Sequence, residues 1–219
     1  MFLDREEAAI RLLRKLAAYR GCRDAVVLAV PRGGLPIGGV LARGLSLTLD
    51  VILTKKIGHP ANPEFAIGAV GLTDQTVDEE LARREGISAR WLSEEIARIR
   101  AGLRERYRLY RGEQLPPSFA GMTVILTDDG AATGRTLTVA IDFLRREDAA
   151  RIVVALPVAP PETVELLRSR ADEVICLETP SNFLAISQSY EDFSPVADEA
   201  AVSILRGAAR AGPTLGERT

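Results

Sequence analysis

The sequence predicts an α/β protein in which helices flank both faces of a parallel sheet. Apolar, β-branched runs of strand length alternate with segments of helical periodicity along most of the chain. Several of these runs are apolar at every position, which is typical of strands buried on both faces. Strands that alternate with helices form parallel sheets, because each crossover helix returns the chain to the same edge.

Helical periodicity marks five segments. Asp4 is suited to cap the first, and the longest carries an apolar stripe that includes Trp91 and Leu103. Helices are expected at residues 4–20, from Gly34 to about 43, at 87–111, at 134–147 and at 160–170.

Runs rich in Val, Ile and Leu lie between these helices. The first, Ala25–Val30, is apolar throughout and predicts a buried strand. Strands are expected at residues 25–30, 49–54, 123–127, 151–156 and 173–177, with a small hairpin from 67–70 and 76–77. Ligands of such sheets bind beyond the carboxyl ends of the strands, so the loops that follow them should converge.

Composition indicates a folded enzyme-like domain. The chain has 219 residues, of which 47% are hydrophobic and 26% charged. Its 28 Lys and Arg nearly balance 30 Asp and Glu, so the net charge of −2 gives no general attraction to nucleic acid or anionic membrane. The early charges exclude a secretory signal, and no apolar run is long enough to span a bilayer, so we expect a cytoplasmic protein.

One segment, residues 124–136, predicts a site for a phosphorylated sugar. An apolar strand ends in Asp128 and Asp129, small residues follow, and a helix begins near Gly134. Small residues let a ligand approach the backbone, and N–H groups at a helix start bind anions. Thr133 and Thr136 add hydroxyl donors, and the carboxylates suit sugar hydroxyls or a metal already bound to them. An ordinary strand–turn–helix is the alternative, but it does not require Thr-Gly-x-Thr.

This segment resembles the phosphoribosyl pyrophosphate (PRPP) motif of the type I phosphoribosyltransferases, which has a hydrophobic strand, two acids and this threonine–glycine loop. The resemblance implies that Asp128 and Asp129 hold the ribose hydroxyls and that the loop wraps the 5-phosphate. The PRPP-binding residues implied are Asp128, Asp129, Gly130, Ala131, Ala132, Thr133, Gly134, Arg135 and Thr136. It also implies Mg²⁺ as cofactor, held mainly by ligand oxygens, with the two acids reaching it through water at most.

The resemblance extends to a group of bacterial and archaeal phosphoribosyltransferases of unassigned base. It is carried by Val30–Gly34, Asn62–Val70 and Tyr190–Phe193, and covers roughly residues 1–206. It implies one phosphoribosyltransferase-like domain with an inserted long helix and a small hood, partly from residues 180–195. Residues 207–219, rich in Gly, Ala, Arg and Pro, are expected to form a disordered tail.

A second glycine-containing loop follows the first strand. Gly33 and Gly34 can form a backbone cradle for an anion at the helix start, and Arg32 adds a donor for phosphate. A plain loop is the alternative for this turn taken by itself. By resemblance these three residues form the pyrophosphate loop, in which many family members have one cis peptide bond.

Lys55 and Lys56 follow the strand expected at 49–54. Lysines there can neutralise a departing pyrophosphate, so with Arg32 they are the expected catalytic residues. A surface loop with solvated lysines is the alternative.

The aromatic residues Phe183, Tyr190 and Phe193 cluster near the C-terminal end. One ring could stack on a base in the hood, or the three could pack an irregular flap against the core.

Ala132 stands where the hypoxanthine-guanine branch of the family has an aspartate that assists proton transfer at the purine. Its methyl group argues against 6-oxopurine salvage in the usual form.

The leading hypothesis is a Mg²⁺-dependent phosphoribosyltransferase that moves the 5-phosphoribosyl group of PRPP to a nitrogen of a purine- or pyrimidine-like base and releases pyrophosphate. One alternative is a PRPP-sensing regulator that binds nucleic acid through an arginine stripe on the long helix. Another is a phosphorolytic or hydrolytic enzyme acting on a phosphorylated sugar. The expected partners are small molecules, without nucleic acid or membrane, and a homodimer is left open.

Overall fold

The structure is a computed structural model that describes residues 1–209, apart from the side chains of Glu64 and Ala209. It consists of two compact units. The first combines Met1–Ile52 with the chain from Pro117 onward, and the second is Leu53–Pro116.

The first unit is built on a five-stranded sheet in the order β2-β1-β6-β7-β8, with every pair parallel. Ala29 of β1 pairs with Thr127 of β6, so these two neighbouring strands end level with each other. Their loops therefore leave the sheet side by side. The strands are β1 (Ala25–Ala29), β2 (Thr48–Val51), β6 (Thr123–Thr127), β7 (Arg151–Val158) and β8 (Glu173–Glu178).

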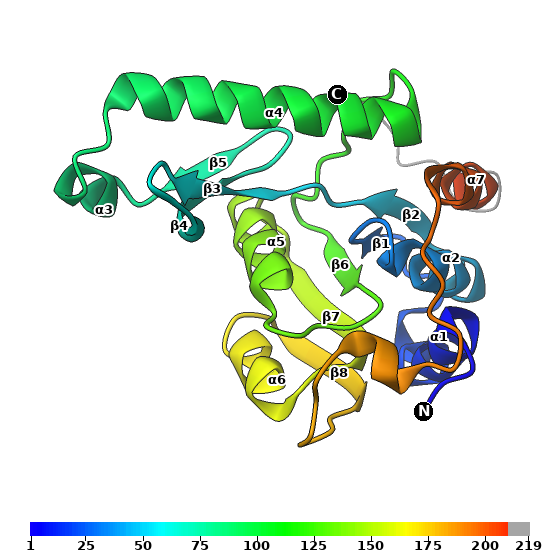
Figure 1. Ribbon diagram of the computed structural model, residues 1–219. Helices are drawn as coiled ribbons and strands as arrows, with labels where there is room; N and C mark the ends of the chain where they lie inside the picture. The colour runs from blue at the N-terminus through cyan, green and yellow to red at the C-terminus, as the bar shows by residue number, and fades with distance from the viewer. Residues whose placement is uncertain (210–219) are drawn as a thin grey trace. The chain divides into compact units, whose positions relative to one another are not determined.

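Helices cover both faces of this sheet (Figure 1). The helices α1 and α2 lie on one face, where α1 contacts β7 and β8 and α2 contacts β1, while α5 and α6 lie on the other. Asp4 caps α1 by accepting a hydrogen bond from the N–H of Glu7. The helical segments are α1 (Arg5–Lys15), η1 (Ala17–Tyr19), α2 (Gly34–Leu45), α5 (Arg135–Arg146), α6 (Pro161–Arg168), η2 (Ile186–Ser189) and α7 (Asp198–Ala209).

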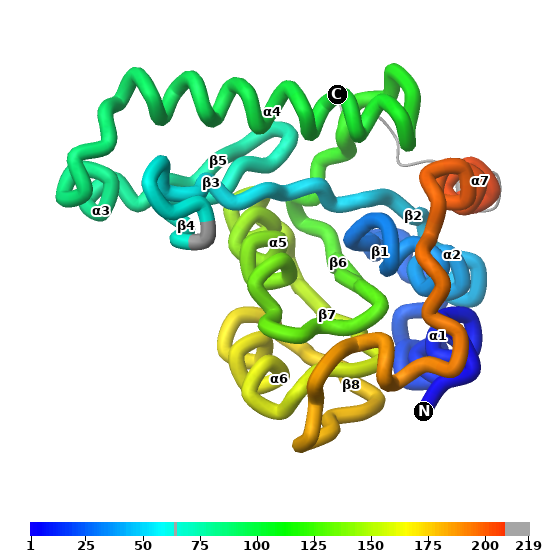
Figure 2. Tube along the Cα trace, in the orientation of Figure 1, coloured from blue at the N-terminus to red at the C-terminus, as the bar shows by residue number. Residues whose placement is uncertain are grey.

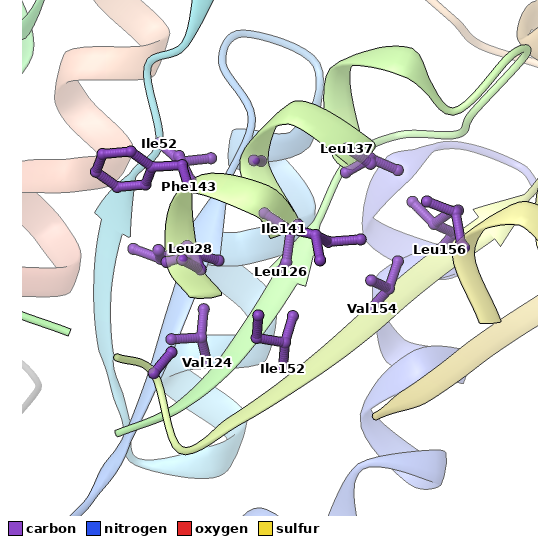
Figure 3. Close-up of a cluster of buried hydrophobic side chains, with 14 of the residues drawn as sticks. Leu28, Ile52, Val124, Leu126, Leu137, Ile141, Phe143, Ile152, Val154 and Leu156 are labelled. Carbon is purple, nitrogen blue, oxygen red and sulfur yellow. The ribbon is translucent and has the colours of Figure 1, made fainter. Parts of the chain in front are cut away.

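A hydrophobic core fills the space between the sheet and the helices α5 and α6 (Figure 3). Alternate residues of β1, β6 and β7 face it, as the period of two in a β-strand requires. Its members include Leu28 of β1, Leu126 of β6 and Val154 of β7, packed against Leu137 and Ile141 of α5. This packing fixes the strand ends from which the candidate site is built.

The second unit contains a three-stranded antiparallel sheet in the order β3-β4-β5. Its long helix α4 buries Ile96, Ile99, Leu103 and Tyr107 on one side, as the helical spacing of these residues predicts. The elements are β3 (Lys55–His59), β4 (Asn62–Val70), β5 (Gln75–Val77), α3 (Glu79–Arg84) and α4 (Ala89–Arg111).

The predicted fold class is confirmed: the parallel sheet, the helices on both faces, the small hairpin and the long inserted helix are all present. Three details differ. The strand expected at 49–54 ends at Val51, β3 and α3 occupy segments for which no element was expected, and α7 adds a helix at 198–209. Of the tail expected at 207–219, residues 207–209 end α7, and 210–219 lie outside the described residues. The assignment of 1–206 to a single domain stays a prediction.

Among the described residues, we find no helix with the length and apolarity needed to cross a membrane.

Candidate functional site

The loop after β6 is held in place by the neighbouring strand and helix. The buried hydroxyl of Thr127 donates a hydrogen bond to the carbonyl oxygen of Ala155, and the N–H of Ala131 donates to that of Val158. On the other side, the hydroxyl of Thr163 donates to the carbonyl oxygen of Ala132 at 2.7 Å. The loop that follows β6 is therefore anchored to β7 and α6.

Gly134 turns this loop into α5. Its φ of 68° is left-handed, a conformation that glycine adopts without strain, and a Cβ at this position would lie 3.0 Å from Thr163 Cγ2. No side chain in the described chain caps the first turn of α5. Thr133 and Thr136 are exposed beside this helix start, whose first N–H groups have no partner within the helix.

The loop after β1 packs directly against the two carboxylates. A Cβ built on Gly33 would lie 2.1 Å from Oδ2 of Asp129, and one built on Gly34 would lie 2.9 Å from the Cα of Asp128. Only glycine permits this approach, which explains both glycines at the start of α2. The Pro31–Arg32 peptide bond is cis.

Arg32 is exposed at the tip of this loop. Its nearest acidic partner is Asp198 at the start of α7, with Nη1 and Oδ1 3.7 Å apart and both side chains about two-fifths exposed. An exposed pair at this distance is weak, so the guanidinium is available to an anionic ligand.

The two adjacent acids have different environments. Burial raises the pKa of Asp128 well above its ordinary value, and the charge of Asp129 raises it further, although Oδ1 of Asp128 accepts a hydrogen bond from the N–H of Asp129. Burial also raises the pKa of Asp129, but the hydrogen bonds of Arg5 to its carboxylate oppose that shift. Asp129 is therefore the acid with a built-in counter-charge.

Arg5, at the start of α1, was not identified from the sequence. Its Nε and Nη2 donate to Oδ2 of Asp129 at 3.0 and 2.8 Å, and only 11% of either side chain is exposed. The two residues are 124 positions apart, so no local pattern links them. The sequence marks only the helix that begins there.

The three aromatic residues proposed for the base lie in a small hydrophobic cluster of the first unit. Tyr190 is buried, and its ring centre is 5.4 Å from that of Phe2 and 5.1 Å from that of Phe193. Its hydroxyl donates to the carbonyl oxygen of Asp129 at 2.6 Å. Phe183 packs against the same cluster. These contacts agree with the second alternative given above, in which the three rings pack an irregular flap against the core.

Lys55 and Lys56 belong to the second unit, where they form the first two positions of β3. They do not end a strand of the parallel sheet, because β2 stops at Val51. Their pairing is with Val70 and Ala69 of β4. Their catalytic role stays a prediction.

The described residues contain no group of three or more His, Cys, Asp or Glu side chains that could hold a metal ion. Asp128 and Asp129 supply a pair of hard oxygen donors, which suits a cation that brings most of its other ligands from water and a polyphosphate. This donor set fits Mg²⁺ carried by the substrate.

Comparison with known proteins identifies relatives along nearly the whole chain. Two proteins of Mycobacterium tuberculosis, from strains H37Rv and CDC 1551 and both named “putative phosphoribosyl transferase”, are 33% identical over 211 residues, which is 96% of this chain. The chain spans about half (47%) of the length of these relatives.

A crystal structure of the protein TT1426 from Thermus thermophilus has the same fold, with a TM-score of 0.83 and 39% identity over 97% of this chain and 99% of that one. The family model described as “Phosphoribosyl transferase domain” matches residues 2–194, a range that includes both glycine loops and the paired acids. The chain therefore belongs to the phosphoribosyl transferase family.

Proposed function

We propose that this protein transfers the 5-phosphoribosyl group of PRPP to a nitrogen of a purine- or pyrimidine-like base and releases pyrophosphate. The observation that carries the proposal is the contact between two loops at the level ends of β1 and β6. Gly33 and Gly34 bring the anion cradle at the start of α2 against Asp128 and Asp129. A single ligand with a diol between two phosphate groups matches this arrangement.

In this proposal, residues 131–136 bind the 5-phosphate. No side chain caps the start of α5 in the described structure, and the macrodipole of a 12-residue helix favours a negative charge there. The exposed hydroxyls of Thr133 and Thr136 donate to phosphate oxygens. Asp128 and Asp129 accept hydrogen bonds from the ribose hydroxyls.

The pyrophosphate occupies the loop at Arg32, Gly33 and Gly34. Charge grows on the leaving group as the bond to the anomeric carbon breaks, and the sugar becomes oxocarbenium-like. Catalysis of this kind is mainly positioning and electrostatic stabilisation. Arg32 stabilises that charge from the loop, and we propose Lys55 or Lys56 as a second cation.

Mg²⁺, when bound with PRPP, supplies charge neutralisation on the pyrophosphate. Asp128 and Asp129 are the residues that would hold it, through water. We propose that the activity depends on Mg²⁺ and that the protein is cytoplasmic.

Ala132 bears on the acceptor. Its methyl group cannot accept or donate a proton, so no acid acts from that position. We therefore propose that the acceptor is not a 6-oxopurine whose proton transfer depends on an acid at this position.

Isothermal titration with PRPP and Mg²⁺ tests the shared site. Binding is expected for the wild type and is expected to be lost in the double variant Asp128→Asn with Asp129→Asn, while circular dichroism shows an intact fold. Asp142→Asn, which changes an exposed acid of α5 paired with Arg170, is the matched control. Unchanged PRPP affinity in the double variant would contradict the role given to the two acids.

Pyrophosphate release across a panel of bases then separates a transferase from the alternatives. A base-dependent release supports the transferase. Binding of PRPP with no turnover on any base, together with an RNA or DNA gel shift, supports the sensing regulator instead. That role would need the arginine stripe of α4, which consists of Arg100, Arg104, Arg108 and Arg111. In the described part of the chain, however, Arg100 bonds to Gln75 and Arg108 lies 3.8 Å from Glu113. Release of free ribose 5-phosphate without a base indicates the hydrolytic enzyme.

A further inference from the structure

The carboxylate of Asp129 is held from two sides. Arg5 directs both Nε and Nη2 to the same oxygen, Oδ2, and leaves Oδ1 outside the pair. The backbone of Gly33 also packs against this carboxylate, since a Cβ there would lie 2.1 Å from Oδ2 and 2.9 Å from Oδ1. A carboxylate fixed at one oxygen has one orientation for the other, because the two oxygens share a plane.

Arg5 is itself held by the C-terminal segment. Its Nη1 donates to the carbonyl oxygen of Ser194 at 2.9 Å, and its guanidinium carbon lies 3.9 Å from the centre of the Phe193 ring. A planar guanidinium stacked on an aromatic face loses little freedom when it bonds, because its donors are already oriented.

The segment that carries Phe193 is in turn joined to the N-terminal residues. Phe2 donates from its N–H to the carbonyl oxygen of Ser189 and accepts from the N–H of Glu191, and the N–H of Asp192 donates to the carbonyl oxygen of Leu3. Figure 2 shows the N-terminal residues, in blue, and the segment that precedes α7, in orange, side by side. This short parallel pairing aligns Arg5 and Tyr190 with the same acid.

We propose that Arg5 is a positioning residue, which holds the carboxylate of Asp129 in the orientation in which Oδ1 meets the ribose diol. The inference rests on the proposed function, because it names the group that prepares one of its two acids. Tyr190 supports the same acid through the bond to its carbonyl oxygen, and Phe193 supports Arg5. These two rings then act on sugar binding and not on the choice of base.

The test compares variants by isothermal titration with Mg²⁺ and PRPP. Arg5→Met removes the donors, Arg5→Lys keeps the charge without the two-donor geometry, and Tyr190→Phe removes one hydrogen bond while keeping the ring. Arg14→Met is the control, since it makes the same change on an exposed residue of the same helix. Loss of a group that orients a binding side chain typically weakens affinity about 10–100-fold, which is the loss expected for Arg5→Met. Arg5→Lys should recover part of it, Tyr190→Phe should show a smaller loss, and Arg14→Met should show none.

A second ligand pair separates positioning from general destabilisation. The wild type should bind ribose 5-phosphate more tightly than 2,3-dideoxyribose 5-phosphate, and Arg5→Lys and Tyr190→Phe should reduce that preference. An equal loss for both sugars would mean that these residues only maintain the fold, and would overturn the inference.

The outcomes also separate the two proposals. A wild type that binds no PRPP removes the proposed function. A wild type that binds PRPP, with Arg5→Lys and Tyr190→Phe equally tight, leaves the function standing and overturns the positioning role. Should Arg5→Met fail to fold, the other two variants decide.

Discussion

Replacing Arg5 should destabilise the protein far more than replacing a surface arginine, because it leaves Asp129 buried without its counter-charge. The perturbation is Arg5→Met, which keeps much of the length of the side chain. Asp129→Asn and the double variant complete a thermodynamic cycle. The cycle isolates the interaction between the two side chains from their other contacts.

The magnitude follows from the geometry of the pair. Two N–H donors reach one carboxylate oxygen at 2.8 and 3.0 Å, with 11% of each side chain exposed. Breaking a buried pair by removing one partner destabilises a protein by about 3–5 kcal/mol. A change of 1 kcal/mol shifts the melting temperature of a chain of this size by roughly 2–4 °C, so Arg5→Met should lower it by roughly 6–20 °C at pH 7. The double variant should lose less than the sum of the single variants, with a coupling energy of about 2 kcal/mol or more.

Thermal melts followed by circular dichroism measure all four proteins of the cycle. The control cycle uses Arg168 and Glu165 of α6, whose side chains are 57% and 69% exposed although their ion pair is 2.6 Å long. Exposed pairs of this kind couple by about 0.5 kcal/mol or less. A coupling energy for Arg5 and Asp129 no larger than that of the control cycle would refute the reasoning.

Two further outcomes are expected at the same site. Asp128→Asn should raise the melting temperature at pH 7, because the raised pKa of Asp128 means that the folded protein binds its proton more tightly than the unfolded chain does. Below the ordinary pKa of an aspartic acid, the wild-type carboxyl is protonated in both the folded and the unfolded state, and it costs no stability. The cost appears as pH rises through the folded-state pKa of Asp128. The advantage of the variant should therefore shrink toward pH 4 in melts across that range. An equal advantage at every pH would argue against ionisation as its source. Gly33→Ala should abolish PRPP binding, because the new Cβ would lie 2.1 Å from a carboxylate oxygen of Asp129. The control is Gly102→Ala in α4, where the new Cβ meets nothing within 4 Å. Thermal melts should show that this control stabilises the helix by up to about 1 kcal/mol. Retained PRPP affinity in Gly33→Ala would show that the two loops tolerate a wider separation.

The parallel sheet could be predicted because its signals are local. An apolar run such as Ala25–Ala29, buried at every position, indicates a two-sided strand from its residues alone. The same holds for the periodic face of α4 and for Asp4 as the cap of α1. β3 was missed because its strand character is not a local signal. Lys55–His59 contains two lysines and a glycine, and its strand character comes from antiparallel pairing with β4, which the segment alone does not encode.

The part of the candidate site that is formed by consecutive residues was predictable, and the contacts between residues far apart in the sequence were not. The motif from Asp128 to Thr136 is continuous, and the structure places it after β6 at the start of α5. Arg5 is brought to Asp129 by tertiary packing of the first helix, so its role depends on contacts that no spacing records. The aromatic residues fall between these cases. Their clustering was visible, but whether the rings face a ligand or one another depends on the pairing of Phe2 with Tyr190.

The different electrostatic environments of Asp128 and Asp129 suggest how one site can be stable when empty and still bind a charged ligand. Two ionised carboxylates in a buried position repel each other, and a counter-charge on both would leave neither available. Here Arg5 neutralises Asp129 through one oxygen, while burial and that neighbour keep the pKa of Asp128 high. Asp128 is thus the acid whose ionisation gains most from an arriving cation, and Asp129 the acid already set in place. Exchanging Arg5 for a neutral residue should then make both acids harder to ionise, because Arg5 lowers the pKa of each. PRPP affinity should therefore fall more steeply with decreasing pH in Arg5→Met than in the wild type.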